Sequence, residues 1–379
     1  MHYTIHMTAN CNMRCTYCYV TQKPVKMTLE TARAVVDNAI RGGQKRLGLI
    51  FFGGEPLLCR DLIEETIEYV KKTAPKDVNF HYKMTTNGLL LDEAFMEYAN
   101  REKIYIALSL DGIAKAHDTH RIAQNGGSTH AEVERAAKLL LRTRPYAPAL
   151  MTVNPDTVKY YAQSVEYLFE LGFEYMICSL NYAVQWDKKA LRELKRQYKR
   201  LAKFYYEHTL AEDKFYLSPF EVKISSHVHN KTYCHERCEL GQRQLSVGPD
   251  GTLYPCVQFV GDERYSVGDV FNGIDEEKRR SLFVQNETEK PGCDVCSIRS
   301  RCNHYCACLN KQATGSIDKI SPVLCAHERI ILPIADKVAG KLYKKKNSMF
   351  IQKHYNDFYP VISLVEDKAG QGQSELNSN

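Results

Sequence analysis

Long apolar runs are absent from this chain. No stretch approaches the about 18 unbroken apolar residues of a membrane span, which excludes a transmembrane helix. The first eight residues also lack the basic start and the apolar core of a secretory signal peptide. These two absences predict a cytoplasmic protein with no membrane partner.

A strong excess of one charge is missing too. Lys and Arg number 51 and Asp and Glu number 45, which gives a formal net charge of +6. We interpret the tight basic run Lys344-Lys345-Lys346 as a solvated helix face. Nucleic acid binding needs a localised basic stripe, so we expect no nucleic acid partner. The composition, 44% hydrophobic and 25% charged, is that of an ordinary globular protein.

Cysteine, in contrast, is abundant. The chain has 14 Cys among its 379 residues. Disulfides are rare in a reducing cytoplasm, so cysteines in this number predict metal ligation.

Strand-like apolar runs alternate with helical patterns over residues 3 to 181, as in βα units around a parallel sheet. The predicted strands are 3–8, 46–53, 80–86, 104–110, 149–154 and 174–180, and the predicted helices lie near 28–42, 60–73, 92–101, 129–143 and 156–171. Six units are too few for the usual eight-stranded barrel. The predicted fold class is therefore α/β, with a partial, open-sided (β/α)6 TIM-type barrel.

The remaining chain divides into three parts. Apolar residues recur at helical spacing over 187–210, which indicates a long amphipathic helix that joins two modules. From Cys234 to Cys325 the sequence is irregular and Cys-dense, as expected where metal clusters substitute for an apolar core. The predicted boundaries are a barrel over 1–186, a helical linker over 187–230, a Cys-rich domain over 231–330, and a C-terminal helix with a mobile tail over 331–379, the helical part being 326–365.

Three cysteines form a compact group after the first strand. Cys11, Cys15 and Cys18 are separated by three and then two residues. Four Cys thiolates normally hold a four-iron cluster, so three would leave one iron for an exchangeable ligand. Zinc is the alternative, although zinc sites favour four protein ligands.

Further conspicuous residues follow the next three strands. They are Gly53-Gly54-Glu55, Thr86-Asn87-Gly88 and Ser109-Leu110-Asp111. In parallel barrels the active site lies in the loops at the carboxyl ends of the strands. We therefore expect these residues to meet the Cys triad at one edge of the sheet.

A second set of cysteines follows in the C-terminal part. Its members are Cys234, Cys238, Cys256, Cys293, Cys296, Cys302, Cys306, Cys308 and Cys325. Paired thiolates on turns also form zinc ribbons, so this set alone leaves zinc and iron–sulfur clusters open.

Taken together, the two patterns resemble the radical SAM superfamily with a C-terminal SPASM domain, as in RiPP maturases and anaerobic sulfatase-maturating enzymes, over roughly residues 3–330. The first signature is the triad with Tyr17 just before Cys18. The second is a series of seven, which matches Cys238, Cys256, Cys293, Cys296, Cys302, Cys306 and Cys325 in order and spacing.

The resemblance implies S-adenosylmethionine and three [4Fe-4S] clusters. One cluster on the triad would bind the cofactor, and two would be auxiliary. The first auxiliary cluster would take Cys234, Cys238, Cys256 and Cys306, and the second Cys293, Cys296, Cys302 and Cys325. Cys234 lies nearer to Cys238 than in the sulfatase-maturating relatives, so an open iron is the alternative for the first. Cys59, Cys178 and Cys308 match no motif position, and we interpret them as packed thiols.

Several residues, Tyr17 among them, would then contact the cofactor. The glycines Gly53 and Gly54 would permit a close approach of the backbone, and Glu55 would pair with the ammonium group. Ser109 and Asp111 resemble the family's ribose-contacting pair, the alternative for them being a simple Asp-Gly turn.

The residues after the third and fourth strands can have either a functional or a purely structural role. Asn87 is either a cofactor contact or part of an Asn-Gly turn. His117 and Arg121 follow the fourth strand, where Arg121 would contact a carboxylate.

One departure from the relatives bears on the reaction. Sulfatase-maturating enzymes carry an aspartate that acts as a base directly after the Cys that matches Cys256. In this chain that position is Val257. Valine cannot accept a proton, which disfavours formylglycine formation. We predict an enzyme that abstracts hydrogen from a peptide residue and installs a thioether or another crosslink in a ribosomal peptide.

Two alternative functions are those of an anaerobic sulfatase maturase and of a non-catalytic zinc-ribbon protein that binds nucleic acid. We expect an electron donor such as flavodoxin or ferredoxin. Because the first strand begins near residue 3, we expect no leader-binding domain ahead of the barrel.

Overall fold

The computed structural model describes residues 1–229, 239–359, 362, 363 and 365. All six predicted strands are present to within one residue at each end: β1 His2–Thr8, β2 Arg46–Gly53, β3 Asn79–Thr86, β4 Ile104–Ser109, β5 Pro148–Val153 and β6 Tyr175–Leu180. The predicted helices correspond to α1 Leu29–Arg41, α2 Arg60–Thr73, α3 Glu93–Arg101, α5 His130–Thr143 and α6 Tyr161–Glu170. A short helix, α4 Ala114–His120, was not predicted.

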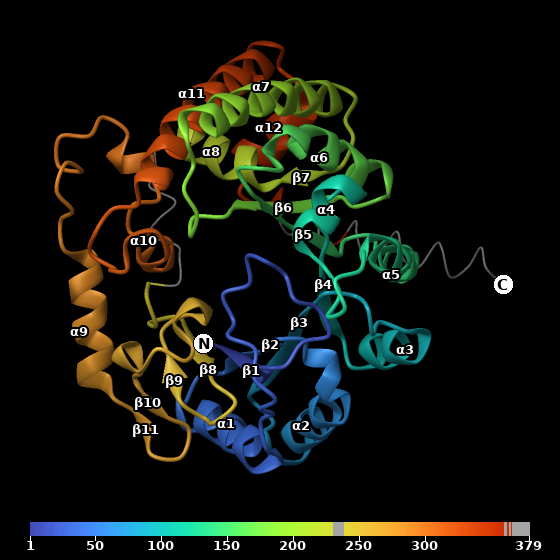
Figure 1. The fold of residues 1–379 in the computed structure, drawn as a ribbon, viewed down its shortest axis with the longest axis vertical. Helices are drawn as coiled ribbons and strands as arrows, with labels where there is room; N and C mark the ends of the chain where they lie inside the picture. The colour runs from blue at the N-terminus through green and yellow to red at the C-terminus, as the bar shows by residue number, and fades with distance from the viewer. Residues whose placement is uncertain (230–238, 360–361, 364, 366–379) are drawn as a thin grey trace.

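Strands β1 to β6 pair in parallel and form a curved sheet. Helices α1, α2, α3 and α5 cover its outer face, as Figure 1 shows. Buried apolar residues recur along its strands, although β1 and β3 also carry polar residues. Ile5, Leu49 and Phe51 are completely buried, for example. This arrangement confirms the α/β fold class and the open-sided barrel.

Helix starts follow the capping rules. Thr28 precedes α1 and its hydroxyl accepts a hydrogen bond from Thr31 N. Asp92 does the same for α3 through Phe95 N. A side-chain oxygen at this position satisfies a helix N–H that has no partner inside the helix.

The sheet extends beyond the six predicted strands. Strand β7 (Tyr216–Leu217) pairs with β6, and β8 (Gln244–Val247) pairs in parallel with β1. Strand β9 (Leu253–Tyr254) adds an antiparallel edge. The stretch from Cys234 to Cys325, which we expected to be irregular, therefore contains strands, and β8 and β9 complete the sheet of the barrel. A segment as short as Gln244–Val247 carries too few residues to signal a strand on its own.

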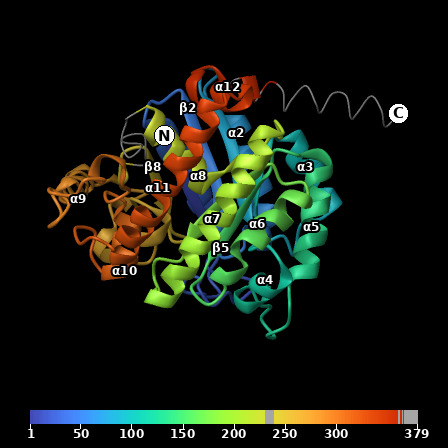
Figure 2. The ribbon, with the colours of Figure 1, turned by 90° about the horizontal axis from the view of Figure 1, so that it is seen from above.

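The amphipathic helix predicted over 187–210 is α7, Lys188–Leu210. It packs against α6 of the barrel and against α11 (Pro322–Lys344), so it contacts both of the parts that it joins. Figure 2 shows α6, α7 and α11 side by side. Helix α8 (Ser218–Val228) packs on α11 and β6.

The C-terminal part lies along the open side of the arc of strands in Figure 1. Its remaining elements are β10 Gly268–Asp269, β11 Gly273–Ile274, α9 Glu276–Glu287, α10 Ala307–Thr314 and α12 Ser348–Tyr355. Short 3-10 helices occur along the whole chain, at Pro56–Cys59 (η1), Val158–Tyr160 (η2), Val257–Phe259 (η4), Glu263–Tyr265 (η5) and Arg299–Arg301 (η6). The helix predicted from 326 begins earlier, at Pro322, because Ser321 caps it. The tail predicted over 366–379 lies outside the described residues.

Across the part of the chain that the structure describes, every helix is too short or too polar to cross a membrane.

Candidate active site

A cavity of about 320 Å³ lies at the carboxyl edge of the sheet. The residues that end β2, β3, β4, β5 and β6 line it, together with the Cys loop, which we define as residues 9–27. The predicted site residues that reach it are Cys11, Cys15, Tyr17, Cys18, Gly53, Gly54, Glu55, Asn87 and Ser109. The expectation that these motifs meet at one edge of the sheet is therefore confirmed.

The three thiols of the triad face this cavity. The backbone turns sharply between the last two, where Cys18 N donates to Cys15 O at 3.1 Å. Met13 N donates to Cys11 Sγ at 3.4 Å. Burial raises the pKa of Cys11 to about 12 and also raises that of Cys15.

These thiols suit a cluster better than a single ion. In the described residues, no three Cys, His, Asp or Glu side chains gather closely enough to bind one metal ion. A four-iron cluster offers a separate iron to each thiolate, so its ligands need not converge on one point. Three thiols facing one cavity fit such a cluster.

Gly53 and Gly54 allow the Cys loop to approach β2. A Cβ on Gly54 would lie 2.0 Å from Asn10 O, and one on Gly53 would lie 2.4 Å from Thr8 O. In this close contact, Gly54 N donates to Thr8 O at 2.8 Å. The close approach at these glycines is thus made by the end of β1, at Thr8, and by the start of the Cys loop, at Asn10.

Glu55 is buried beside the cavity. Its Oε1 accepts hydrogen bonds from Thr86 Oγ1 at 2.8 Å and Leu57 N at 3.1 Å, and its Oε2 accepts from Asn87 N at 2.8 Å. Burial outweighs these donors and raises the pKa of Glu55 to about 7. The nearby Arg121 pairs with Asp111 rather than with Glu55.

Asn87 forms the turn that its Asn-Gly sequence predicts, whereas its contact with the cofactor stays a prediction. Its Nδ2 donates to Asn12 Oδ1 at 2.7 Å and lies 3.6 Å from Cys11 Sγ. Its Oδ1 accepts from Leu89 N at 3.1 Å, which is an Asx turn. The side chain therefore both shapes the turn after β3 and holds the Cys loop.

Asp111 is positioned behind the cavity wall. Its Oδ2 accepts from Tyr17 OH at 2.6 Å and lies 3.1 Å from Arg121 Nε, and its Oδ1 accepts from Thr152 N at 2.9 Å. Asp111 is not among the cavity-lining residues, whereas Tyr17 and Arg121 are. The carboxylate expected to contact Arg121 is thus that of Asp111.

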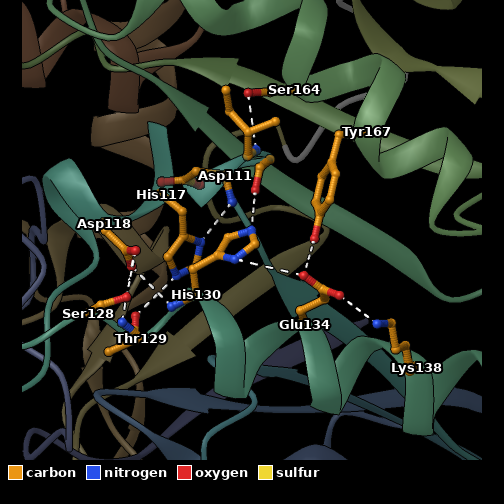
Figure 3. A network of polar contacts seen from close by, with 12 residues as sticks. Asp111, His117, Asp118, Ser128, Thr129, His130, Glu134, Lys138, Ser164 and Tyr167 are labelled. Carbon is orange, nitrogen blue, oxygen red and sulfur yellow. Dashed lines mark hydrogen bonds and ion pairs between the residues drawn. The ribbon is translucent and has the colours of Figure 1, made fainter. Parts of the chain in front are cut away.

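A buried polar network holds the loop that carries Asp111 (Figure 3). Asp111 N donates to His117 Nδ1 at 3.3 Å, and His117 Nε2 lies 3.1 Å from Thr129 Oγ1. Burial lowers the pKa of His117 to about 2, which keeps the ring neutral and able to accept this bond. His130 Nε2 lies 3.0 Å from Gly112 O in the same loop. His117 therefore supports the site without lining the cavity.

Some lining residues were not predicted. Thr152, Ser179 and Asn181 come from the ends of β5 and β6, and Gln258 and Gln312 come from the C-terminal part. The rule that active sites lie after barrel strands applies equally to β5 and β6, so it points to the first three. No sequence signal pointed to the two glutamines, because the packing of the C-terminal part on the barrel sets their position.

Four predicted ligands gather at a second place. Cys293, Cys296, Cys302 and Cys325 together line a cavity of about 50 Å³. Arg329 Nη2 lies 3.5 Å from Cys296 Sγ. Four thiols around one small cavity are the donor set of a complete four-iron site.

The other predicted auxiliary ligands are only partly described. Cys234 and Cys238 lie outside the described residues. Cys256 is buried, and its Sγ lies 2.9 Å from that of Cys308. Cys308 is therefore buried next to a predicted ligand. Cys59 is buried, with its Sγ 3.7 Å from Met7 O, and Cys178 is partly buried against the core.

Comparisons with known proteins agree with this geometry. Residues 5–168 match the family model of the radical SAM superfamily. A cysteine-type anaerobic sulfatase-maturating enzyme from Clostridium perfringens is 25% identical over 299 residues, which are 75% of this chain and 80% of that protein.

Two solved structures share the fold. One is native anSMEcpe with bound AdoMet, with a TM-score of 0.78 at 21% identity, covering 90% of this chain and 99% of that one. The other is Streptococcus suis SuiB bound to the precursor peptide SuiA, with a TM-score of 0.61 at 14% identity, covering 86% and 75%. With its Cys triad at the mouth of a parallel barrel, this chain is an enzyme whose barrel, over residues 5–168, matches the radical SAM superfamily.

Proposed function

We propose that this enzyme uses S-adenosylmethionine to modify a peptide, and that the modification is a thioether or another crosslink in a ribosomal peptide. The observation that carries the proposal is a single cavity lined both by the triad and by residues of the C-terminal part. The matched structures support a peptide substrate, since one contains the precursor peptide SuiA and another anSMEcpe structure contains the Cp18Cys peptide.

The cofactor would be held by groups already described. Cys11, Cys15 and Cys18 would hold the cluster, and Glu55 would pair with the ammonium group. When bound and reduced, the cofactor supplies a 5′-deoxyadenosyl radical that removes a hydrogen atom from the substrate. Ser109 lines the cavity and can donate to a sugar hydroxyl. Asp111 would act by positioning Tyr17 and Arg121.

The peptide would enter between the barrel and the C-terminal part. Gln258 and Gln312 line this side, and Gln312 Nε2 donates to Gln258 Oε1 at 2.6 Å. Amides both donate and accept hydrogen bonds, as recognition of a peptide backbone requires. Leu309 adds an apolar contact beside them.

Formylglycine formation is the second candidate, because the Clostridium relative named above performs sulfatase maturation. Val257 at the base position argues against it. Glu55 is the one carboxylate on the cavity among the described residues, and three hydrogen bonds already engage it. The third alternative, a non-catalytic zinc-ribbon protein, is not supported, since the chain matches an enzyme superfamily.

The resemblance to the SPASM-containing enzymes also supports auxiliary clusters, an electron donor and a division into domains. We infer two auxiliary [4Fe-4S] clusters, the second of which fits the four thiols around the small cavity. We also infer a flavodoxin or ferredoxin as electron donor, and a cytoplasmic location. The domain boundaries at 186, 230 and 330 belong to the same proposal.

Anaerobic turnover tests the function. The reconstituted enzyme would be incubated with reductant, S-adenosylmethionine and each short peptide encoded beside its gene. We expect a loss of two hydrogens per crosslink in the mass of one peptide, and no change with Cys15→Ala. Formylglycine in a co-expressed sulfatase would instead support the second candidate. Unchanged masses for all peptides would contradict the crosslinking proposal.

A further inference from the structure

Helix α7 carries a concentration of positive charge. Its 23 residues include eight Lys or Arg and two Glu, which give the helix a net charge of +6. The whole chain also has a net charge of +6, so the residues outside this helix include 43 basic and 43 acidic side chains. The excess of positive charge, which the composition does not locate, therefore lies on one helix.

Four of these cations form a stripe along the solvent side of α7, which lies on the outside of the molecule (Figure 2). They are Lys188, Arg192, Lys195 and Lys199. All four are exposed, and their spacing of four, three and four residues puts them on one face of the helix over about 16 Å. Among the described residues none of the four forms an ion pair, whereas the neighbouring Arg196 pairs with Glu193 at 2.8 Å.

A groove of about 900 Å³ begins at the amino end of this helix. Three of the cations that line it have no ion pair within the described ranges, namely Lys159, Lys189 and Arg192. The carboxylates of the groove are engaged by neighbours. Asp187 accepts from Ala190 N at 2.6 Å and so caps α7. Glu193 accepts from Arg196 at 2.8 Å. The groove therefore offers its unpaired positive charge to a ligand.

The groove adjoins the active-site cavity. Thr152 of β5 and Asn181 after β6 line the cavity, and the loops that follow these two residues line the groove. The groove also contacts the Cys loop through one side chain: His120 Nε2 lies 2.9 Å from Asp156 Oδ1, and His120 Nδ1 lies 2.6 Å from Thr16 Oγ1. A chain that leaves the cavity over the ends of β5 and β6 would enter the groove.

The shape and the charges of this surface favour a peptide over other acidic partners. A groove accepts a chain segment, whereas a globular protein needs a broad complementary surface. Nucleic acid carries a phosphate on every nucleotide, which Asp156, Asp187 and Glu193 in the groove would repel. A peptide can place its carboxylates on the cations and its backbone N–H groups on these acids.

We propose that the groove and the stripe bind an acidic segment of the peptide substrate, while another residue of the same peptide lies in the cavity. Binding at two points raises the effective concentration of the reacting residue at the triad. The positive charge also attracts an acidic peptide to the mouth of the barrel. This inference deepens the proposed function, and it rests on that proposal for a peptide as the substrate.

Fluorescence anisotropy with the full-length enzyme tests the surface. The probes are a fluorescein-labelled peptide in which Glu alternates with Gly, a matched peptide with Gln in place of Glu, and a single-stranded DNA of the same length. The groove variant combines Lys159→Gln, Lys189→Gln and Arg192→Gln. The control variant combines Lys344→Gln, Lys345→Gln and Lys346→Gln, which remove the same charge at the carboxyl end of α11. That end lies near the carboxyl end of α7, because Lys341 Nζ is 5.7 Å from the ring of Tyr206.

We expect the acidic peptide to bind the wild type more tightly than either of the other probes. The groove variant should bind it about 5-fold to 30-fold more weakly, and the control variant should match the wild type. Added salt should weaken the wild-type complex. Equal weakening in the groove and control variants would reduce the effect to net charge and overturn the proposal. Tighter binding of the DNA, or no binding of the acidic peptide, would overturn it too.

Turnover separates this inference from the proposed function. With a precursor peptide that the wild type modifies, the groove variant should raise KM by a similar factor and leave kcat unchanged, because the groove holds the substrate without touching the reacting atoms. A lower kcat at an unchanged KM would contradict the proposal. If the wild type modifies no peptide, the proposed function fails, and the anisotropy measurements still decide whether this surface binds an acidic peptide.

Discussion

Tyr17 donates a 2.6 Å hydrogen bond to Asp111 Oδ2 and so joins the Cys loop to the end of β4. The same carboxylate pairs with Arg121 and accepts from Thr152 N on β5. One buried side chain thus fixes the Cys loop relative to two neighbouring strands. The geometry of the triad therefore depends on residues that do not themselves bind iron.

Removal of the Tyr17 hydroxyl tests this dependence. Tyr17→Phe should lower the free energy of unfolding of the cluster-free protein by about 1.5–3 kcal/mol, because the lost bond goes to a charged acceptor. Urea unfolding measures this loss. Tyr69→Phe is the matched control, since Tyr69 OH donates to Asp37 between two surface helices at 3.0 Å. Equal losses in the two variants would contradict a special role for Tyr17.

Gly54→Ala should prevent assembly of the triad site. The added methyl group would lie 2.0 Å from Asn10 O, so the Cys loop must move away from β2. We expect at least a several-fold loss of the iron bound by the triad, measured in a variant without the auxiliary cysteines. Gly340→Ala is the control, because nothing lies within 4 Å of its added Cβ. An unchanged iron content in Gly54→Ala would refute this account of the loop.

Glu55 should make stability depend on pH. Its pKa is about 7 in the folded protein and 4.5 ordinarily, so the folded state holds this proton more tightly. The contribution of Glu55 to stability is thus complete below pH 4.5 and is lost as the pH rises through 7, a change of about 3 kcal/mol. Urea unfolding of the cluster-free wild type should show this decline, and Glu55→Gln should flatten it. Parallel pH profiles for the two proteins would disprove the assignment.

The same carboxylate should govern cofactor affinity. Ionised Glu55 can pair with an ammonium group, so binding of S-adenosylmethionine to the reconstituted enzyme should tighten as the pH rises through 7. Glu55→Gln should weaken binding by about 10-fold to 100-fold at pH 8 and remove the pH dependence. Isothermal titration under anaerobic conditions measures both effects. Full affinity in Glu55→Gln would show that Glu55 has a purely structural role.

A buried ion pair holds α8 to α11. Lys223 Nζ lies 2.7 Å from Glu328, and the side chains are 7% and 1% exposed. Lys223→Met leaves the carboxylate buried without its partner and should cost about 3–5 kcal/mol. Adding Glu328→Leu should restore much of this stability. A double variant as unstable as Lys223→Met would indicate that packing, rather than charge, determines the loss.

Local sequence patterns predicted the barrel well, because apolar runs and caps act within a few residues. The triad and Glu55 were placed together by the rule that loops follow parallel strands. That rule does not specify which side chains form hydrogen bonds with each other. The three donors to Glu55 and the hydrogen bond from Tyr17 to Asp111 could therefore not be predicted. The contact of Cys308 with Cys256 could not be predicted for the same reason, since it joins residues far apart in the chain.

The pairing of β8 with β1 also bears on how the chain folds during synthesis. His2 of β1 lies opposite Gln244 of β8. During synthesis, β1 is therefore made long before the strand with which it pairs on this edge. Until then one edge of β1 has unpaired backbone groups and can pair with other chains. A fragment that ends at residue 186 would keep this edge open, and it should aggregate more readily than the longer chain. Translation past β8 is therefore the step that closes the barrel's first edge.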